Sequence, residues 1–504
     1  MIRTSLSSSS GSKISAFFPL LLAFATAFAV IAPAHAQSNL VKLSTDTFHN
    51  TDSEHRTEVE PDTFAWGSTI VSAFQVARVP DGGGADVGFA TSKDGGKTWT
   101  HGYLPGLTDH YKGGRFTAAS DAAVAYDAKH GQWLISTLPI TNNQGEAVAT
   151  SRSADGLTWG KPVIVDQSGS DDKNWITCDN TPTSPHYGNC YTEWDEPGLG
   201  DLIFMSTSTD GGLTWSPGKN TADSASGLGG QPLVQPNGNV VVPIDGFGGM
   251  IAFSSTDGGK SWSSTSLIAN QNFRGEDGGL RSPGLPSAAI DGAGTIYVVW
   301  PDCSFRSGCS TDDIVLSTST DGKTWTNPVR IPIDSINSTV DHFIPGLGVD
   351  PATSGTTAHL ALTYYYYPVA SCGSSCKLQV GFTVSQDGGK TWTAGKHLAG
   401  PMKLSWLPQS QNGLMVADYL AVAYSNANPF GVFAVAKAPT SGKFNEAMYT
   451  TKAPLLASAR ERRFSSKREK PVPNAKGKYV WKYYDDDGEY PIPPSKQINL
   501  PKQK

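Results

Sequence analysis

The chain has 504 residues and a formal net charge of −6 at pH 7, and 54 of its residues are glycine. This length suits one large domain or two ordinary ones, and the acidic balance argues against nucleic acid as the main partner. Frequent glycine together with 10% aromatic residues is typical of many short strands joined by tight turns.

The first segment, residues 1–36, is predicted to be a signal peptide. Arg3 and Lys13 supply a weakly positive start, residues 16–33 are apolar, and Ala34-His35-Ala36 fits the small-x-small cleavage pattern. Cleavage after Ala36 predicts a mature chain that begins at Gln37 and is secreted or periplasmic. A membrane anchor is the alternative, because the apolar run is near the lower limit for a bilayer span, and no later run is long enough to cross one.

One eight-residue phrase, first seen as SKDGGKTW, recurs five more times with small changes. The six copies occupy residues 92–99, 153–159, 208–215, 255–262, 319–325 and 385–392. In each copy the Asp-Gly pair tolerates positive φ, and the Asp carboxylate can accept backbone N–H groups of the same turn. The Trp that follows can bury its ring between neighbouring sheets. Each phrase is therefore predicted to be a hairpin turn within a repeat architecture.

The apolar runs around the phrases predict an all-β protein, a β-propeller of four-stranded antiparallel blades over residues 37–451. Blades are expected to begin near residues 62, 122, 172, 231, 287, 341 and 418. The seventh unit lacks the phrase, and residues 39–44 could supply its missing strand and close the ring, which would remove the exposed sheet edges. Seven blades is the preferred count, and six is the alternative.

The six cysteines form three local pairs: Cys178 with Cys190, Cys303 with Cys309, and Cys372 with Cys376. In an exported chain this arrangement predicts three short-range disulfides. Metal binding is the alternative, but the pairs are scattered over three blades and lack the C-x-x-C spacing of zinc sites. The disulfides would pin long loops, and such loops on a propeller often shape a binding site.

The last segment, residues 452–504, differs from the rest in charge. It holds 13 Lys and Arg against 6 Asp and Glu, a net of 13 − 6 = +7, and it is rich in proline without strand periodicity. We expect a disordered or loosely attached tail. A basic arm that binds an anionic surface is the alternative.

The repeated phrase matches the Asp-box, S-x-D-x-G-x-T-W, of sialidase-like (neuraminidase superfamily) propeller proteins, whose repeats are also called BNR repeats. The resemblance covers roughly residues 40–451. It implies the propeller fold and an exo-acting glycoside hydrolase that acts on a glycan or glycoconjugate. In that family the boxes lie at the blade periphery, away from the substrate, so each box here is expected to hold a turn.

The candidate site follows from the geometry of a propeller, in which the inner strands converge on the axis. Residues just before these strands surround one mouth of the central channel, and polar or ionisable residues recur there in nearly every blade. For any one of them the alternative is that it caps a turn. We expect the substrate-binding residues to be Arg115, Lys173, Trp175, Arg274, Asp341, His342 and Asp418.

The resemblance also implies a mechanism, in which three arginines hold the substrate carboxylate, a Tyr with a Glu partner is the nucleophile, and an Asp is the acid/base. The catalytic candidates are Asp121, Asp172, Tyr419 and Arg281, and Arg115 and Arg274 could complete the arginine cluster. The family's Phe/Tyr-Arg-Ile-Pro motif is not where it should be. Ala77-Arg78-Val79-Pro80 lies only 14 residues before Ser92, and Val329-Arg330-Ile331-Pro332 follows the fifth box.

Three functions are therefore compatible with the sequence. The first is glycoside hydrolysis, the second is binding of a glycan or protein without catalysis, and the third is a polysaccharide lyase that uses His342 or His186 with a tyrosine. We expect no cofactor and no metal, because no contiguous calcium-loop pattern is present. The oligomeric state is left open.

Overall fold

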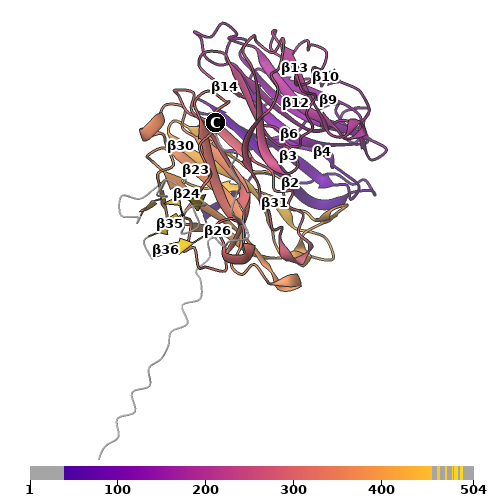
Figure 1. Ribbon diagram of the computed structural model, residues 1–504. Coiled ribbons are helices and arrows are strands. Elements are labelled where there is room, and N and C mark those ends of the chain that lie inside the picture. Colours follow the sequence, from indigo (N-terminus) through magenta and orange to yellow (C-terminus); the bar gives the residue numbers. More distant parts are fainter. Residues whose placement is uncertain are drawn as a thin grey trace, which may run out of the picture. The chain divides into compact units, whose positions relative to one another are not determined.

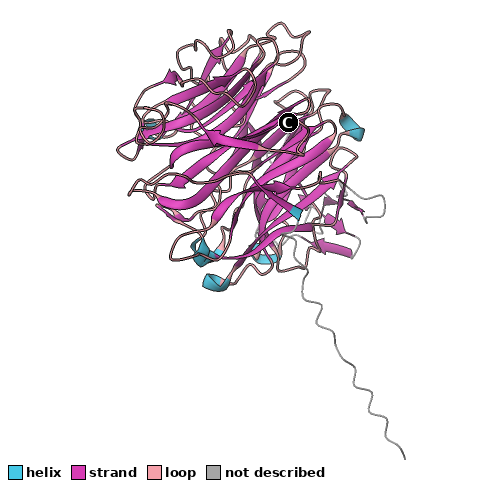
Figure 2. Ribbon diagram, turned by 180° about the vertical axis from the view of Figure 1, so that it is seen from behind, coloured by secondary structure: helices cyan, strands magenta, loops and turns pink. Residues whose placement is uncertain are grey.

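The computed structural model describes residues 39–456 and several short strands between residues 463 and 491, all within one compact unit of residues 36–504. Strands make up most of this unit, and its helices are single 3-10 turns (Figures 1 and 2). These turns are η2 (Pro197–Leu199), η3 (Asp277–Gly279), η4 (Ser307–Cys309), η5 (Gly355–Thr357), η6 (Gly373–Ser375) and η7 (Leu404–Trp406). None of the described helices is long and apolar enough to span a membrane. The predicted signal peptide lies outside the described residues.

The first sheet has nine strands and is antiparallel. Its strands are β2 (Glu54–Trp66), β3 (Thr69–Arg78), β4 (Gly84–Ser92), β5 (Thr100–Tyr103), β6 (Ala118–Asp127), β7 (Gln132–Thr141), β8 (Gln144–Gly145), β9 (Val148–Ser153) and β10 (Val163–Asp166).

Five smaller sheets follow along the chain, the first with three strands and the others with four. The three-stranded sheet contains β11 (Asp172–Cys178), β12 (Cys190–Glu196) and β13 (Leu202–Ser208). The next contains β14 (Leu233–Val234), β15 (Val240–Asp245), β16 (Gly249–Ser255) and β17 (Ser266–Asn270). It is followed by β18 (Ser287–Ile290), β19 (Ile296–Asp302), β20 (Asp313–Ser319) and β21 (Val329–Arg330), and then by β22 (Asp341–Val349), β23 (Leu360–Tyr367), β24 (Lys377–Ser385) and β26 (Lys396–Lys403). The last joins β1 (Leu40–Lys42) to β29 (Ala421–Ser425), β30 (Asn428–Ala436) and β31 (Glu446–Thr451).

The innermost strands contact one another in a closed cycle. In order around the ring, β2 contacts β6, followed by β11, β14, β18, β22 and β29, and β29 contacts β2 again. This all-β ring of antiparallel sheets is a β-propeller arrangement, as the sequence predicts.

Ring closure by the N-terminal segment is also confirmed. β1 pairs antiparallel with β31, so that Leu40 lies opposite Thr451 and Lys42 opposite Tyr449. The final sheet therefore takes one strand from the start of the chain and three from its end, and β1 covers the edge of β31 while forming the outer edge of the sheet itself.

The expected seven separate four-stranded blades are not found as such. Five sheets of three or four strands are separate, while β2 to β10 form a single sheet of nine. The nine strands are continuous because Gly84 at the start of β4 pairs with Ala119 of β6, which joins two groups of strands. The sheet of β11 to β13 lacks a fourth strand because only isolated pairs, such as Met205 with Lys219, continue it.

The six box turns have the predicted structure. In the first, Ser92 Oγ donates to Asp94 Oδ1 at 2.9 Å, and this oxygen also accepts the N–H groups of Lys97 and Thr98 at 3.0 and 2.9 Å. Thr98 Oγ1 donates to the other carboxylate oxygen at 2.6 Å. The hydrogen bonds from Thr98 lower the pKa of Asp94 to about 2. The other copies repeat the bonds from Ser to Asp and from the turn N–H groups to Asp.

The tryptophans of the boxes are buried to different extents. Trp392 is completely buried, Trp159 and Trp262 are nearly so, and the other three are half-buried. Neighbouring units of the ring are also joined by backbone-to-side-chain hydrogen bonds at or beside their inner strands. These run from Val124 N to Asp62 Oδ2 (2.6 Å), from Ala288 N to Gln231 Oε1 (2.7 Å) and from Leu347 N to Ser287 Oγ (3.0 Å).

All three predicted disulfides are present, between Cys178 and Cys190, Cys303 and Cys309, and Cys372 and Cys376. The first joins directly paired residues of β11 and β12. The second and third lie in the connections from β19 to β20 and from β23 to β24.

The segment from residue 452, predicted to be a disordered or loosely attached tail, contains several described strands. The described chain continues past this point, and Leu455 is buried in the core. Beyond it, β32 (Arg463–Ser465) pairs with β25 (Thr391–Thr393) of the sixth box. Two further short pairs are β33 (Val472–Pro473) with β34 (Tyr479–Val480) and β35 (Lys482–Asp485) with β36 (Gly488–Pro491). Pairing to an available strand edge outweighs the weak periodicity of the tail. A remaining short pair, β27 (Gln409–Ser410) with β28 (Gly413–Leu414), precedes β29.

Candidate functional site

Three inner strands carry an irregularity at the same place, near their beginning. Glu60 of β2, Asp121 of β6 and Lys173 of β11 all have positive φ (54°, 44° and 50°), and each lies where the strand register shifts. Such a bulge redirects a side chain away from the regular alternation of a strand. Non-glycine residues seldom adopt this conformation, and backbone strain of this kind is concentrated at functional sites.

These three side chains meet at the ring axis. Lys173 Nζ lies 3.5 Å from Glu60 Oε1, 3.3 Å from Asp121 Oδ1 and 2.5 Å from Asp418 Oδ2. All four side chains are at least nine-tenths buried. Arg281, which precedes β18, completes the group with a bidentate pair to Asp418, in which the Nε–Oδ1 distance is 2.8 Å. We call Glu60, Asp121, Lys173, Arg281 and Asp418 the axial cluster.

Burial and mutual charge set the protonation of the axial cluster. Burial raises the pKa of Glu60 to about 8, and the charge of Lys173 only partly opposes this shift. Burial would lower the pKa of Lys173, but the carboxylates of Asp121, Asp418 and Glu60 raise it well above its usual value. Burial alone would raise the pKa of Asp418. The charges of Lys173 and Arg281 outweigh burial and hold this pKa well below its ordinary range. The cluster therefore keeps an ionised Asp418 between two cations.

Two aromatic residues border the axial cluster. The ring of Tyr419 meets that of Trp175 edge to face, with 5.1 Å between ring centroids, and Lys173 Nζ lies 5.5 Å from the Tyr419 centroid. The Tyr419 hydroxyl is buried and has no hydrogen-bond partner among the described residues. Burial raises its pKa well above the usual value, and the nearby charge of Glu60 adds to this effect.

The space at the cluster is small. A cavity of about 10 Å³ is lined by Asp121, Lys173, Trp175 and Tyr419, together with residues of the next two units. This volume is about the minimum for one water molecule, whereas ligand pockets usually measure about 300–1,000 Å³.

Asp172, the other candidate acid, lies beside the cluster and is partly exposed. Burial and the charge of Asp121 raise its pKa to about 6. Its strand partner is Asp195, whose carboxyl group is buried without a hydrogen bond and whose pKa burial raises to about 10. Glu193, two residues earlier on the same face of β12, is also completely buried. Asp172 thus connects the cluster to carboxyl groups that hold their protons at neutral pH.

The other predicted arginines do not join the axial cluster. Arg115 is exposed, donates to Gln167 at 2.8 Å and covers the ring of Phe116. Arg274 pairs instead with Asp341, with 3.2 Å between Nη1 and Oδ2. The arrangement of three arginines around a substrate carboxylate is therefore not formed by Arg115, Arg274 and Arg281.

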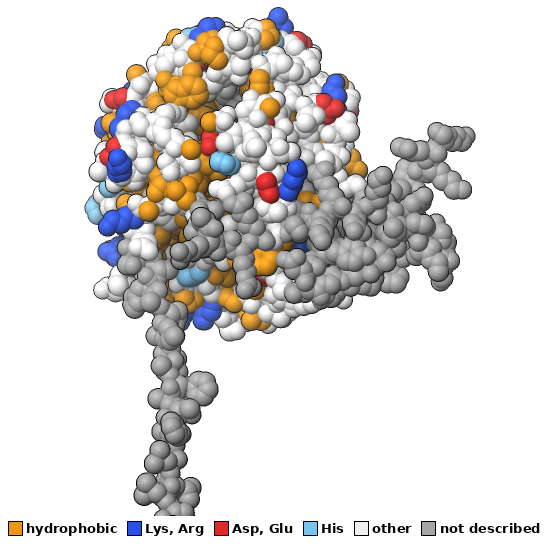
Figure 3. Space-filling view, turned by 90° about the vertical axis from the view of Figure 1, so that its left-hand side faces the viewer, with side chains coloured by type: hydrophobic (Ala, Val, Ile, Leu, Met, Phe, Trp, Pro, Cys, Tyr) orange, Lys and Arg blue, Asp and Glu red, His pale blue; other side chains and the backbone are white. Residues whose placement is uncertain are grey.

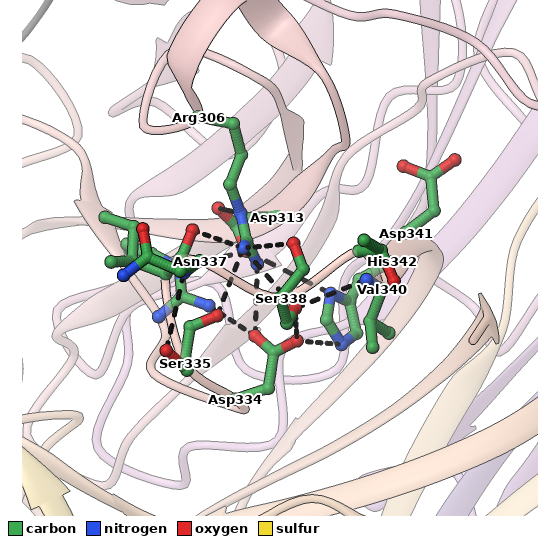
Figure 4. A network of polar contacts seen from close by, with 12 residues as sticks. Arg306, Asp313, Asp334, Ser335, Asn337, Ser338, Val340, Asp341 and His342 are labelled. Atoms are coloured by element: carbon green, nitrogen blue, oxygen red, sulfur yellow. Dashed lines mark hydrogen bonds and ion pairs between the residues drawn. The ribbon is translucent and has the colours of Figure 1, made fainter. Parts of the chain in front are cut away.

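His342 belongs to a second network, between β20 and β22, which Figure 4 shows from close by. Arg306 donates to both oxygens of Asp313, at 2.7 and 2.6 Å, and its Nη2 atom lies 3.1 Å from Asp334. Arg330 contacts the same two carboxylates. His342 lies 4.0 Å from each carboxylate, and burial lowers its pKa. With 2% of its surface exposed, His342 cannot reach a polysaccharide, so the structure gives no support to its proposed role as a lyase base.

The loop closed by the third disulfide, between Cys372 and Cys376, contacts Asp277. Asp277, three residues after Arg274, accepts the N–H groups of Cys372 and Gly373 at 3.0 and 3.1 Å. The loop of the first disulfide lies elsewhere. His186 from this loop lines a larger cavity, of about 360 Å³, with Trp215, Lys219 and Asp257 of the third and fourth boxes and the segments beside them.

Two charged residues near the axis, Glu60 and Arg78, are not among the predicted catalytic or substrate-binding residues, although Glu60 was among the residues expected at the mouth of the channel. Glu60 has the inner-strand position of Asp121 and Lys173, so its place before Asp62 was an available signal. Arg78 is the last residue of β3 and is 2% exposed. Its guanidinium group donates to Gln75 at 3.1 Å. Gln75 in turn donates to Glu60. The sequence did single out Arg78, as the arginine of the upstream match to the family's motif, but this match lies only 14 residues before Ser92 and was not taken as a site.

Two groups of residues have the donor types and the spacing of a cation site. They are Asp313, Asp334 and His342 in one case and Asp166, Asp171 and Glu196 in the other, and in each the donor atoms lie within 4.8 Å of one another. In the first, Arg306 and Arg330 already neutralise the carboxylates, which leaves a cation little electrostatic advantage. The second group is considered below.

On the face seen in Figure 3, acidic and basic side chains lie singly among polar and hydrophobic ones. This face shows no continuous area of one charge of the kind that a polyanion would need.

Comparison with known proteins agrees with the box turns. Residues 186–349 match the BNR repeat-like domain family. A sialidase from Bacteroides fragilis is 29% identical over 157 residues, and the match covers 27% of this chain and 27% of that sialidase. The chain thus spans about a quarter of the length of this relative.

Solved structures show a weaker likeness. A protein of unknown function from Dyadobacter fermentans is 15% identical with a TM-score of 0.45, over 69% of this chain and 98% of that one. NanB sialidase from Streptococcus pneumoniae is 14% identical with a TM-score of 0.40, over 82% of this chain and 70% of that one. The six box turns and the ring of sheets make the chain a β-propeller with Asp-box turns, and its residues 186–349 are similar to the BNR repeat-like domain family.

Proposed function

We propose that this protein is an exported, glycan-binding propeller that recognises an acidic glycan over the mouth of the ring, above the axial cluster. The observation that carries the proposal is that Lys173 and Arg281 are both already paired with buried carboxylates around a cavity of about 10 Å³. A sugar ring does not fit into this space, so recognition takes place at the partly exposed rim rather than inside the channel. We also propose that the nine-stranded sheet acts as two blades, which makes the ring seven-bladed.

The rim supplies the groups that an acidic glycan would use. Arg281 is 20% exposed and pairs with Asp418 through Nε and Nη2, so its Nη1 atom lies outside that pair. Arg274 is 19% exposed. Trp175 is partly exposed and meets the ring of Tyr419, and aromatic faces with cations around them suit pyranose rings that carry a carboxylate.

Glycoside hydrolysis is the second candidate, and one observation favours it. Burial, together with the nearby charges of Glu60 and Asp121, raises the pKa of the Tyr419 hydroxyl, and burial raises the pKa of Glu60 to about 8. A carboxylic acid that holds its proton near neutral pH is suited to protonate a leaving group. This function requires that the axial cluster open to admit a sugar.

The test combines binding and turnover on the full chain. We expect retention on acidic members of a glycan array and no release from a panel of fluorogenic glycosides that includes a sialic acid α-glycoside. Arg281→Ala should weaken binding at least tenfold, while Arg115→Ala, which removes an exposed arginine outside the cluster, should leave it unchanged. Release that is lost in both Asp121→Asn and Asp172→Ala would favour the hydrolase. Silence in both assays with a folded protein would refute a role in glycan recognition.

A further inference from the structure

A second acidic group lies close to the axial cluster in sequence but is distinct from it. Asp166 ends β10, Asp171 immediately precedes β11, and Glu196 ends β12, so three separate segments bring one carboxylate each to the same place. Their donor atoms lie within 4.8 Å of one another. Three negative charges at this distance repel one another strongly unless a proton or a cation compensates them.

Among the described residues, no cationic side chain supplies this compensation. No lysine or arginine there forms an ion pair with any of the three carboxylates. Asp171 is 2% exposed, and its Oδ2 atom is buried without a hydrogen-bond partner, while its Oδ1 atom accepts only from Ser168 Oγ at 2.9 Å. A buried carboxylate oxygen that lacks any donor is costly and rare in native proteins. This oxygen is an observation independent of the acidic composition, and it points to a missing positive partner.

We propose that Asp166, Asp171 and Glu196 bind a Ca²⁺ ion. The donors are oxygens only, which favours a hard divalent cation over zinc or copper. Oxygens bound to one Ca²⁺ ion at about 2.3–2.6 Å lie up to about 5 Å apart, and this range accommodates the spacing of the three carboxylates. Mg²⁺ holds its ligands at about 2.0–2.1 Å in a strict octahedron, which brings them closer together than Ca²⁺ does. Water and the Ser168 hydroxyl beside Asp171 can fill the remaining positions.

The position of the site gives the ion a structural role. The connection from β10 to β11 leads directly from Asp166 through Asp171 into Asp172 and Lys173. Glu196 anchors the same place to the end of β12, the partner of β11. An ion held here would fix the segment that places Lys173 in the axial cluster.

The test measures thermal stability of the full chain after removal of metal with a chelator. We expect 1 mM Ca²⁺ to raise the Tm by a few degrees when the ion is far above its Kd, and 1 mM Mg²⁺ to raise it less. Asp171→Asn should abolish the Ca²⁺ effect. In chelator alone this variant should be at least as stable as the wild type, because it removes one of three repelling charges. Asp109→Asn, at a carboxylate whose side chain is 55% exposed, is the matched control and should respond to Ca²⁺ like the wild type.

Tb³⁺ luminescence provides a readout that does not depend on stability. Trp194 lies two residues before Glu196 on the same face of β12, so excitation of tryptophan should sensitise Tb³⁺ bound at the site, and Ca²⁺ should displace it. If Asp171→Asn fails to fold, Glu196→Gln replaces it. A Tm that does not respond to Ca²⁺ up to 10 mM, or a response that persists in Asp171→Asn, would overturn the proposal. Equal shifts with Mg²⁺ would overturn the preference for Ca²⁺.

Discussion

Replacing Lys173 with methionine tests whether the axial cluster holds the inner strands together. Methionine keeps the length of the side chain but removes the cation that three carboxylates share. Removing one partner of a buried ion pair costs about 3–5 kcal/mol, because the remaining charge stays buried without compensation. Asp418 keeps its bidentate pair with Arg281, so the uncompensated groups are Glu60 and Asp121.

The size of the loss should depend on pH. Below pH 8 Glu60 can take up a proton, since its pKa is already raised to about 8, and the loss should then be near the lower limit of about 3 kcal/mol. At pH 9 the loss should be larger and move toward about 5 kcal/mol, because Glu60 is ionised in the wild type, whereas loss of the Lys173 charge favours its protonated form in the variant. An unfolding entropy of about 2.1 cal/mol/K per residue gives about 0.9 kcal/mol per degree for a unit of this length, so the Tm should fall by roughly 3–4 °C at pH 7 and 5–6 °C at pH 9.

Thermal unfolding followed by tryptophan fluorescence measures these shifts, with urea unfolding as an independent estimate of the free energy. Lys260→Met, at an exposed lysine, is the matched control and should change the Tm by less than about 1 °C. A loss below about 1 kcal/mol at both pH values, or one that is larger at pH 6 than at pH 9, would refute the account of the cluster as a set of buried charges that Lys173 compensates.

Three further predictions concern the rest of the fold. Burial raises the pKa of Glu60 to about 8 and that of Asp62 to about 7. Because the folded state thus favours their protonated forms, their contribution to the free energy of unfolding is complete below about pH 4 and is lost as the pH rises through 7 to 8. The urea midpoint should therefore fall between pH 5 and pH 8.5, and a rise would contradict this prediction. Asp387→Ala in the sixth box removes a turn acceptor and should cost about 1–2 kcal/mol in urea unfolding without altering glycan binding; loss of binding at unchanged stability would give the box another role. Replacing Cys178 and Cys190 with serine should cost about 2–3 kcal/mol, and equal Tm values for the variant and the wild type would show that the strand pairing alone closes this loop.

Much of the fold could be predicted because the repeated phrase specifies its own local structure. In a turn such as that at Asp94, the acceptor, the flexible glycines and the flanking donors are all adjacent in sequence, so no distant contact is needed. The place of residues 39–44 in the last sheet followed from the need to close a ring. The pairing of β4 with β6 could not be predicted from the sequence, because it depends on a single residue pair, Gly84 with Ala119.

The candidate site was predicted less completely. Asp121, Lys173, Asp418 and Arg281 were expected at the mouth, and the structure brings them together. The ion pairs among these side chains depend on the positive φ values of Glu60, Asp121 and Lys173. Such values at non-glycine residues could not be predicted from the sequence. Arg274 and His342 were expected at the same mouth, but each faces carboxylates outside the axial cluster, because strand order alone cannot tell which neighbouring carboxylate an arginine or a histidine will face.

The pairing of β1 with β31 has a consequence for how the protein is made. Leu40 leaves the ribosome early, and its partner Thr451 is translated only near the end of synthesis. Until then β1 lacks its partner β31, and the contact between Leu40 and Thr451 spans 451 − 40 = 411 residues. Contacts of this kind form slowly because a long loop must close first. We therefore expect chaperones that protect unpaired strand edges to matter more for this protein than for one whose sheets each close locally.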